Sequence, residues 1–281
     1  MFRSVALDDL RILAVSGPDR LSFLQGQLTQ DVASARGDRT VMAGWADAKG
    51  RLLFAGHLFY TQVATEDALA LLVPAELAET LLKRLRMYVL RARAQATLLD
   101  LRIVGLIGAP TPAVAGQLLQ ILGERERHLL LRPVAPEAQD KTDQSPRSDW
   151  LLADVRAGIP TIVAETTGEF IAQMVNLDLL DGISFTKGCY TGQEIVARMK
   201  YRGRVKRRML RFGGTMPAPE PGAALYAERG VVGQVVSAAP TAAGCEFLAV
   251  VVLDDLPGPF FLDDTATKAI RRLDLPYQVP L

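Results

Sequence analysis

One short segment of the sequence combines residue types that chemistry most often uses. Residues 187–194 read Lys-Gly-Cys-Tyr-Thr-Gly-Gln-Glu. Thr191 and Glu194 have the spacing of a capping box, which predicts that a helix begins there. Lys187 and Cys189 would then lie in the turn before a helix N-terminus. Free backbone N–H groups, a positive field and a neighbouring lysine favour the thiolate form of a cysteine at such a place.

The neighbouring residues leave two interpretations of this segment open. Gly188 and Gly192 would allow a sharp turn or the close approach of a ligand, which suits a reactive thiol. In the alternative interpretation Cys189 is a small buried side chain and Lys187 a solvated surface charge. The second cysteine, Cys245, precedes an apolar run, and we expect it to be buried and inert.

Basic residues alternate along the chain directly after this segment. They occupy six successive even positions: Arg198, Lys200, Arg202, Arg204, Lys206 and Arg208. Alternate residues of an extended strand share one face, so the spacing predicts a basic ribbon. Such a ribbon suits a polyanion such as a polyglutamate tail, phosphates or RNA. The alternative is an edge strand protected by charge. Only one aromatic residue, Tyr201, is interleaved, which argues against base stacking.

The composition excludes several other classes of protein. Lys and Arg number 32 against 31 Asp and Glu, so only local clustering could bind an anion. Two His and two scattered Cys supply no ligand set for zinc or an iron–sulfur cluster, so we expect no stably bound metal. So few cysteines indicate a reducing compartment. The sequence shows no targeting segment and no long apolar run, which predicts a cytoplasmic protein without a membrane partner.

Helices and strands that alternate irregularly must position these residues, and this irregularity predicts an α+β fold. The pattern predicts a strand at 11–15, a hairpin of 41–47 and 52–60, a strand at 68–73, a helix from Pro74 with Leu77, Leu81, Leu85 and Tyr88 on one stripe, a strand at 98–107, a helix at 112–122, a strand at 150–155, and a small closed β unit after residue 214.

The residues of 187–194 also point to a known family. They resemble the K-G-C-[FYW]-x-G-Q-E signature of the YgfZ family of folate-binding proteins, which are relatives of the glycine-cleavage T-protein, an aminomethyltransferase. Residues 23–32 are similar to the family pattern F-L-Q-G-Q-x-T-x-D-V, and residues 47–51 resemble its hairpin turn. Residues 176–185 fit the lead-in to the signature. The resemblance covers most of the chain and is weakest over residues 110–148 and the C-terminal β unit.

The resemblance implies an architecture of three domains in a ring around a central channel. These would be a discontinuous folate-binding domain of residues 1–45 and 145–205, an inserted ferredoxin-like domain of residues 46–144, and a C-terminal β-barrel of residues 206–281. It also implies a cofactor, tetrahydrofolate or a derivative. The implied function is the assembly or repair of iron–sulfur enzymes, including one that modifies tRNA, with these client proteins as partners.

The resemblance assigns the chemistry to the signature. It makes Cys189, Lys187 and Tyr190 the functional residues, with Gly188, Gly192, Gln193 and Glu194 as motif support. Cys189 would be a transient cluster ligand or a redox-active thiol. Two other functions stay open: a tetrahydrofolate-dependent aminomethyl or one-carbon transferase, with Asp100 as its acid/base group, and an RNA- or protein-binding module.

Three further residues correspond to folate-contacting positions of the family. Trp150 falls on a tryptophan that contacts the folate, and its aromatic plane suits a flat ring. The alternative is an ordinary core tryptophan. Leu10 stands where some relatives have a folate-contacting Trp. Arg156 stands where the related aminomethyltransferases carry a Glu, and a guanidinium, which accepts no hydrogen bond, could instead meet the glutamate tail.

Overall fold

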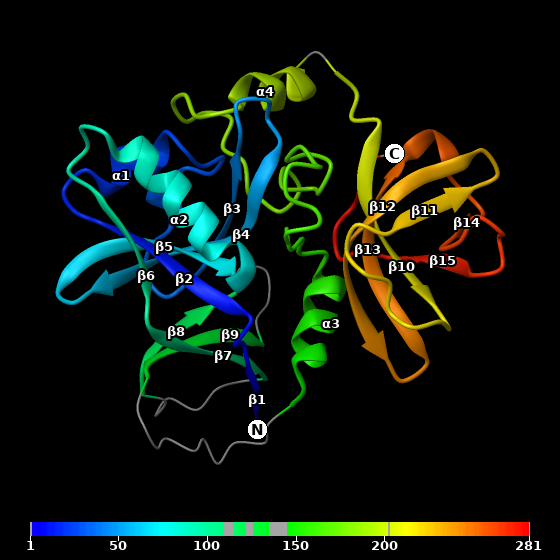
Figure 1. Ribbon diagram of the computed structural model, residues 1–281, viewed down its shortest axis with the longest axis horizontal. Helices are drawn as coiled ribbons and strands as arrows, with labels where there is room; N and C mark the ends of the chain where they lie inside the picture. The colour runs from blue at the N-terminus through cyan, green and yellow to red at the C-terminus, as the bar shows by residue number, and fades with distance from the viewer. Residues whose placement is uncertain (1, 109–114, 122–125, 135–144, 202, 281) are drawn as a thin grey trace. The chain divides into compact units, whose positions relative to one another are not determined.

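The computed structural model describes residues 2–108, 115–121, 126–134, 145–201 and 203–280. The contacts divide the chain into two compact units (Figure 1). The first unit contains residues 1–43, 56–150 and 186–190, and the second contains residues 44–55, 151–185 and 191–281.

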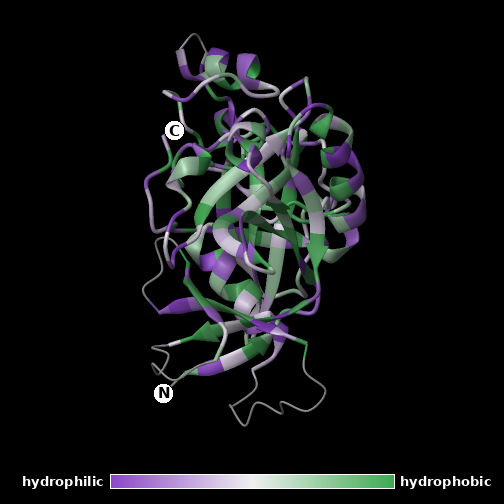
Figure 2. Cartoon of the chain, turned by 90° about the vertical axis from the view of Figure 1, so that its left-hand side faces the viewer, coloured by the Kyte–Doolittle hydropathy of each residue, from purple (hydrophilic) through white to green (hydrophobic). Residues whose placement is uncertain are grey.

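A five-stranded sheet dominates the first unit, and Figure 2 shows hydrophobic residues along much of its strands. Its order is β3 (Val41–Ala46), β4 (Leu52–Val63), β5 (Glu66–Pro74), β2 (Leu10–Ser16) and β6 (Gln95–Leu99). Strand β2 pairs antiparallel with both β5 and β6. The sequence predicted the strands at 11–15 and 68–73 and the hairpin of β3 and β4, and the structure confirms them.

Helix α2 (Ala75–Val89) covers this sheet, and the predicted helix after Pro74 is confirmed. Leucines recur at helical spacing, so Leu77, Leu81 and Leu85 are buried on one face. Tyr88 was expected on the same stripe but is exposed. Helix α1 (Arg20–Gln25) and the 3₁₀ turn η1 (Val32–Ser34) follow β2 along the chain.

A second sheet of four strands completes the first unit. Its order is β1 (Arg3–Ala6), β7 (Leu101–Ile107), β9 (Arg127–Pro133) and β8 (Gln117–Gln120). The prediction of a helix over 112–122 is wrong for 117–120, and residues 112–114 and 122 lie outside the described residues. Leu118 and Leu119 pair with Leu130 and Leu129 of β9, so a partner strand decided their conformation. The strand predicted at 98–107 is two strands, β6 and β7, which belong to different sheets.

The strand predicted at 150–155 is also wrong, because this segment belongs to helix α3 (Arg147–Ala157). Asp149 lies in its first turn and Arg156 in its last, and both charges suit the helix dipole. The apolar residues of 150–155 do not form a clean stripe. A dense apolar run of this kind is typical of a buried strand as well as of a helix, which explains the error.

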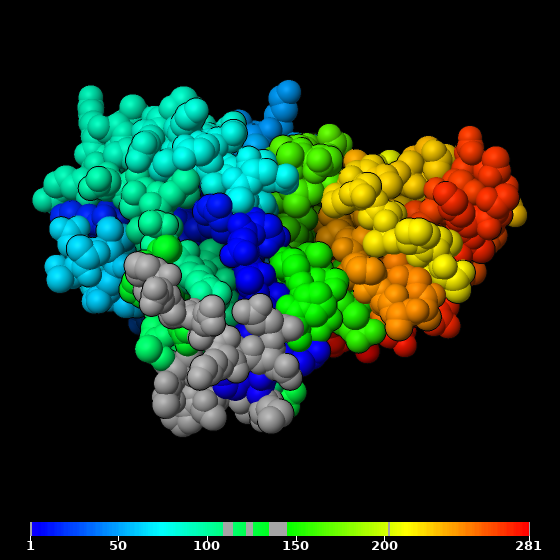
Figure 3. Space-filling model, turned by 60° about the horizontal axis from the view of Figure 1, so that its bottom comes forward, coloured from blue at the N-terminus to red at the C-terminus, as the bar shows by residue number. Residues whose placement is uncertain are grey.

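A closed six-stranded barrel dominates the second unit, as the pattern after residue 214 predicted (Figure 1). Around the barrel the strands are β10 (Arg207–Gly214), β13 (Gly244–Val252), β12 (Gly230–Thr241), β11 (Ala224–Ala227), β14 (Phe260–Phe261) and β15 (Ala269–Leu273). Phe212 stacks on Phe247 at 5.7 Å and meets Phe260 edge-on at 5.5 Å. In the space-filling view the barrel residues, yellow to red, form one compact body (Figure 3).

An irregular segment, residues 158–185, packs on β10 through buried polar groups. Arg208 makes a two-pronged ion pair with Asp178 at 2.6 and 2.9 Å. Asn176 donates to the carbonyl of Met209 at 2.7 Å. Tyr277 donates to the carbonyl of Gly158 at 2.9 Å, and burial raises the pKa of Tyr277 to about 12. These bonds offset much of the cost of burying the polar groups, although Asn176 Oδ1 and Gln173 Oε1 are buried without a partner among the described residues, and they hold the segment without regular secondary structure.

The expected division into three domains stays a prediction. Strand β2, from the expected first domain, lies between β5 and β6, from the expected inserted domain. The remaining helix, α4 (Gln193–Tyr201), belongs to the second unit. No helix in the described part of the chain combines the length and apolarity that a bilayer crossing requires.

Candidate functional site

The loop after α1 provides the backbone carbonyls that contact the start of the signature. Gln25 and Asp31 close this loop: the Gln25 amide donates to the Asp31 carboxylate at 3.1 Å, and the Val32 backbone N–H donates to Gln25 at 2.9 Å. The Asp31 side chain also caps η1. The backbone carbonyls of Leu28 and Gln30 are thereby fixed as acceptors.

Lys187 binds to this loop. Its Nζ donates to the carbonyl oxygens of Leu28 at 2.7 Å and Gln30 at 2.8 Å, and it lies 5.1 Å from the ring centre of Tyr190. Burial lowers the pKa of Lys187 to about 8, against the opposing effect of the Asp31 carboxylate. The interpretation of Lys187 as a solvated surface charge is therefore wrong. The two segments that carry the family resemblance, 23–32 and the start of 187–194, meet at this ammonium group.

Tyr190 is the second buried residue of the signature. Its ring is covered on one side by the Lys187 ammonium, and burial raises its pKa to about 12. The phenol therefore stays neutral at physiological pH. Tyr190 and Lys187 together anchor the loop that carries Cys189. Their assignment as functional residues stays a prediction.

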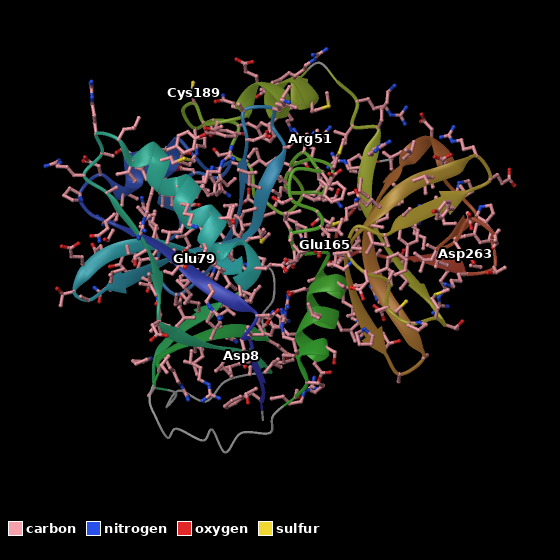
Figure 4. The ribbon with its side chains drawn as sticks, viewed as in Figure 1. Asp8, Arg51, Glu79, Glu165, Cys189 and Asp263 are labelled. Carbon is pink, nitrogen blue, oxygen red and sulfur yellow. The ribbon has the colours of Figure 1, made fainter. Side chains whose placement is uncertain are left out.

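Cys189 lies between these anchors and is exposed (Figure 4). Its side chain points away from the ribbon, and a Cβ added at the neighbouring Gly188 would meet nothing within 4 Å. The alternative of a buried structural cysteine is therefore wrong for Cys189. It holds for Cys245, which is buried in the barrel, where burial raises the pKa of its thiol. The chain thus has one thiol that a large partner can reach.

The end of the signature packs on the hairpin turn of β3 and β4, within the second unit. Gly192 has φ 81°, and a Cβ there would lie 2.6 Å from the carbonyl oxygen of Asp47. Gly50 has φ 74°, and a Cβ there would lie 2.8 Å from Ile195. Asp47 holds the turn by accepting from two backbone N–H groups at 2.8 and 2.9 Å. Both glycines are required by this close approach.

Helix α4 begins close to the predicted start. Its first residue is Gln193, two positions after the expected cap at Thr191, and Gly192 precedes it in the left-handed region. Glu194 lies in the first turn, where its charge suits the helix dipole.

The basic ribbon does not exist as predicted. Arg198 and Lys200 lie on α4, where residues two apart do not share a face. Arg202 lies outside the described residues, and Arg204 lies in an irregular segment before β10. Arg208 points inward to Asp178. The apolar spacing of Ile195, Val196 and Met199 continued the helix, so the even spacing of charges did not indicate a strand.

Two of the folate-contact positions are core positions of the first unit. Trp150 exposes 2% of its surface. One side of its ring packs on Gly105, where a Cβ would lie 2.4 Å from the indole, and the Arg127 guanidinium lies 5.0 Å from the ring centre. Leu10 is buried in β2. Trp150 packs as the core alternative describes, and its contact with folate stays a prediction. Asp100 is exposed between β6 and β7.

Arg156, in the second unit, belongs to a charged network that the sequence did not reveal. Its guanidinium contacts Glu246 at 2.7 Å, and Arg211 contacts the other oxygen of the same carboxylate at 2.7 Å. Arg156 and Arg211 lower the pKa of Glu246. A groove of about 690 Å³ runs beside this network and is also lined by Arg271. Two guanidinium groups on one carboxylate leave a net positive charge at the groove.

Comparison with known proteins decides the family. No family model matches the chain. The chain is 32% identical to the tRNA-modifying protein YgfZ of Serratia proteamaculans (strain 568), over 98% of this chain and 92% of that protein. The chain belongs to the YgfZ family. A second YgfZ-family relative, the tRNA-modifying protein YgfZ of Yersinia enterocolitica, is 30% identical over the same shares.

A solved structure supports the fold of this YgfZ-family chain. The aminomethyltransferase T of the glycine cleavage system from Bartonella henselae matches with a TM-score of 0.72 and 14% identity. The match covers 98% of this chain and 86% of that one. The predicted α+β class and the C-terminal barrel are confirmed. Among the described residues no group of three His, Cys, Asp or Glu side chains is placed to hold a metal ion.

The two glycines of the signature give a matched pair of variants. We expect Gly192→Ala to lower the free energy of unfolding by about 2 kcal/mol or more, because alanine is strained at positive φ and its Cβ would meet the Asp47 carbonyl. Gly188→Ala should leave it unchanged, because its Cβ meets open space. Thermal unfolding measures both, with a loss of roughly 5 °C expected for Gly192→Ala. Equal melting temperatures would contradict the packing.

The buried ammonium group predicts a pH dependence. Burial lowers the pKa of Lys187 from 10.5 to about 8, so between these values the unfolded chain binds more protons than the folded one. The contribution of Lys187 to the free energy of unfolding therefore rises with pH across this window. In protein labelled at lysine ¹³Cε, one NMR signal should titrate near pH 8 and be absent from Lys187→Arg. A wild-type spectrum in which no lysine titrates near pH 8 would show that the ammonium is solvated.

Proposed function

We propose that this YgfZ-family protein binds a reduced folate and helps to assemble or repair iron–sulfur enzymes in the cytoplasm, with Cys189 as its chemical residue. The observation that carries this proposal is one exposed thiol between two residues that are held within the first unit. Lys187 donates to the Leu28 carbonyl, Tyr190 is buried, and Cys189 lies between them. The thiol is therefore exposed on a loop whose backbone is held in place.

A single accessible thiol suits a reaction with a partner protein better than the binding of a complete iron–sulfur cluster. A typical iron–sulfur cluster takes four thiolates, and the only other cysteine of this chain, Cys245, is buried. A client protein would therefore supply the remaining ligands, and Cys189 would be either a transient ligand or a redox-active thiol. Each role needs a partner to reach the sulfur, which the exposure of Cys189 permits.

Tetrahydrofolate or a derivative is the proposed cofactor. We propose that its glutamate tail binds in the groove beside Arg156. Its volume of about 690 Å³ lies in the range of small-molecule sites. Arg156 and Arg271 line it, and guanidinium groups bind carboxylates such as those of a glutamate tail. Glu246 already accepts from Arg156 and Arg211. The closed packing around Trp150 does not offer a ring surface, so no contact with the pterin is assigned there.

The relatives' names suggest the kind of client. Those relatives are called tRNA-modifying proteins. We include among the clients of this chain an iron–sulfur enzyme that modifies tRNA. A transferase acting through Asp100 is the competing function, and turnover of an aminomethyl donor by the purified protein would support it instead.

The role of the thiol is tested by two cysteine variants in cells that lack their own YgfZ-family protein. We expect Cys189→Ser to reduce the activity of an iron–sulfur tRNA-modifying enzyme to the level without the protein, because serine neither binds the cluster comparably nor forms a disulfide. Cys245→Ala should restore activity like the wild type, since that thiol is buried. Modified nucleosides, measured by mass spectrometry, give the readout. Full activity of Cys189→Ser at normal protein level would exclude thiol chemistry.

Folate binding is tested by calorimetric titration with monoglutamyl and triglutamyl tetrahydrofolate. We expect saturable binding of both, and Arg156→Met should weaken the triglutamyl form by about tenfold, the size of a lost charge-assisted hydrogen bond. The monoglutamyl form should lose less. Arg229→Met, which removes an exposed guanidinium elsewhere on the barrel, is the matched control and should bind like the wild type. The absence of binding to either folate would refute this part of the proposal.

A further inference from the structure

Unpaired positive charge gathers on α4 and on the segment that joins it to the barrel. Five exposed basic residues form no ion pair among the described residues: Arg198, Lys200, Arg204, Lys206 and Arg207. Arg208, in contrast, is neutralised by Asp178 and also donates to the carbonyl of Gln173 at 2.9 Å. The free charge of this region is therefore on its surface, and an anionic ligand can reach it.

An exposed aromatic ring lies among these charges. Tyr201 exposes 69% of its surface at the end of α4. Its ring meets Phe185 edge-on, with ring centres 6.4 Å apart and an angle of 77° between the planes. The Lys200 ammonium lies 4.9 Å from the centre of the same Phe185 ring. The Phe185 ring thus contacts both a cation and an aromatic ring.

A groove runs beside Lys200. It has a volume of about 350 Å³, and its lining includes Lys200, Gly203, Arg204 and Val205. The groove places Lys200 and Arg204 along one depression. Two cations along a groove can follow a chain of phosphates, and the exposed ring of Tyr201, which follows Lys200 in the chain, offers a face for stacking.

We propose that this surface binds single-stranded nucleic acid. We call it the α4 surface and define it as Lys200, Tyr201, Arg204 and Lys206. Phosphates would contact the basic side chains, and one base would stack on Tyr201, which is the combination used by proteins that hold unpaired strands. An acidic peptide would use the charges but leave the ring uncovered, and a duplex keeps its base faces stacked inside. The site goes beyond the proposed function and needs neither folate nor Cys189.

The charges are tested with a fluorescent RNA of about 12 nucleotides and mixed sequence, a length within the range of single-strand sites. Anisotropy between about 50 and 200 mM salt should give a log–log slope near −2 if three phosphates are neutralised. The double variant Lys200→Glu, Arg204→Glu should bind at least tenfold more weakly and with a shallower slope. Lys83→Glu, Arg91→Glu changes the net charge equally on exposed residues of the first unit and should bind like the wild type.

The stacking is tested by two substitutions of one residue. Tyr201→Leu should weaken RNA binding by at least about fivefold, the lower limit for loss of one base–aromatic stack. Tyr201→Phe keeps the ring and should bind like the wild type. Circular dichroism melting shows whether each variant folds.

Four results would overturn the proposal. They are the absence of RNA binding by wild-type protein at about 50 mM salt, an equal loss in the first-unit control, unchanged affinity of Tyr201→Leu, and competition by a polyglutamate peptide as effective as by unlabelled RNA. The last two together would indicate an acidic protein partner. Because folate titration is separate, failure here leaves the proposed function standing, and failure there leaves the α4 surface standing.

Discussion

The placement of one ammonium group, that of Lys187, determines how the signature is presented. Removing this charge from water is unfavourable, which is why its pKa falls to about 8. Two backbone carbonyls at 2.7 and 2.8 Å and the face of Tyr190 offset that cost. The carbonyls are available only because Gln25 and Asp31 close the loop that carries them. The buried ammonium group therefore holds the start of the signature in place, because few other positions would give it the same hydrogen bonds.

The second fixed point is steric. Gly192 and Gly50 let the end of the signature and the hairpin turn approach more closely than side chains would permit. The chain passes from the first unit to the second between Tyr190 and Thr191, so each unit holds one end of the signature by its own means. Gly188 and Cys189 lie between Lys187 and Tyr190 within the first unit, and both are exposed. A segment that is anchored at both ends and exposed between them can present a reactive side chain while its backbone stays in place.

Much of this arrangement could be predicted from the sequence, where the physical cause is local. Strong periodicity gave α2 and the β3–β4 hairpin, and turn residues gave the barrel. The errors occurred where a distant partner decides the outcome. Leu118 and Leu119 form a strand because β9 is beside them, and α3 is a helix although its apolar residues follow no clear period. The alternating charges after Arg198 resembled a strand, but the spacing of apolar residues, which determines burial, continued the helix.

Arg156 shows the same limit at the level of chemistry. In the sequence it is a cation where related transferases carry an acid, and nothing nearby indicates its partner. The structure supplies Glu246, 90 residues away, and Arg211 on the other side of that carboxylate. The acid is therefore present in the region but is already occupied, and two guanidinium groups surround it. A site built in this way favours ligands that bring negative charge, and it disfavours a neutral ring that needs a free acceptor. Under the proposed function, the positive charge at this position would favour the glutamate tail of a folate over its ring.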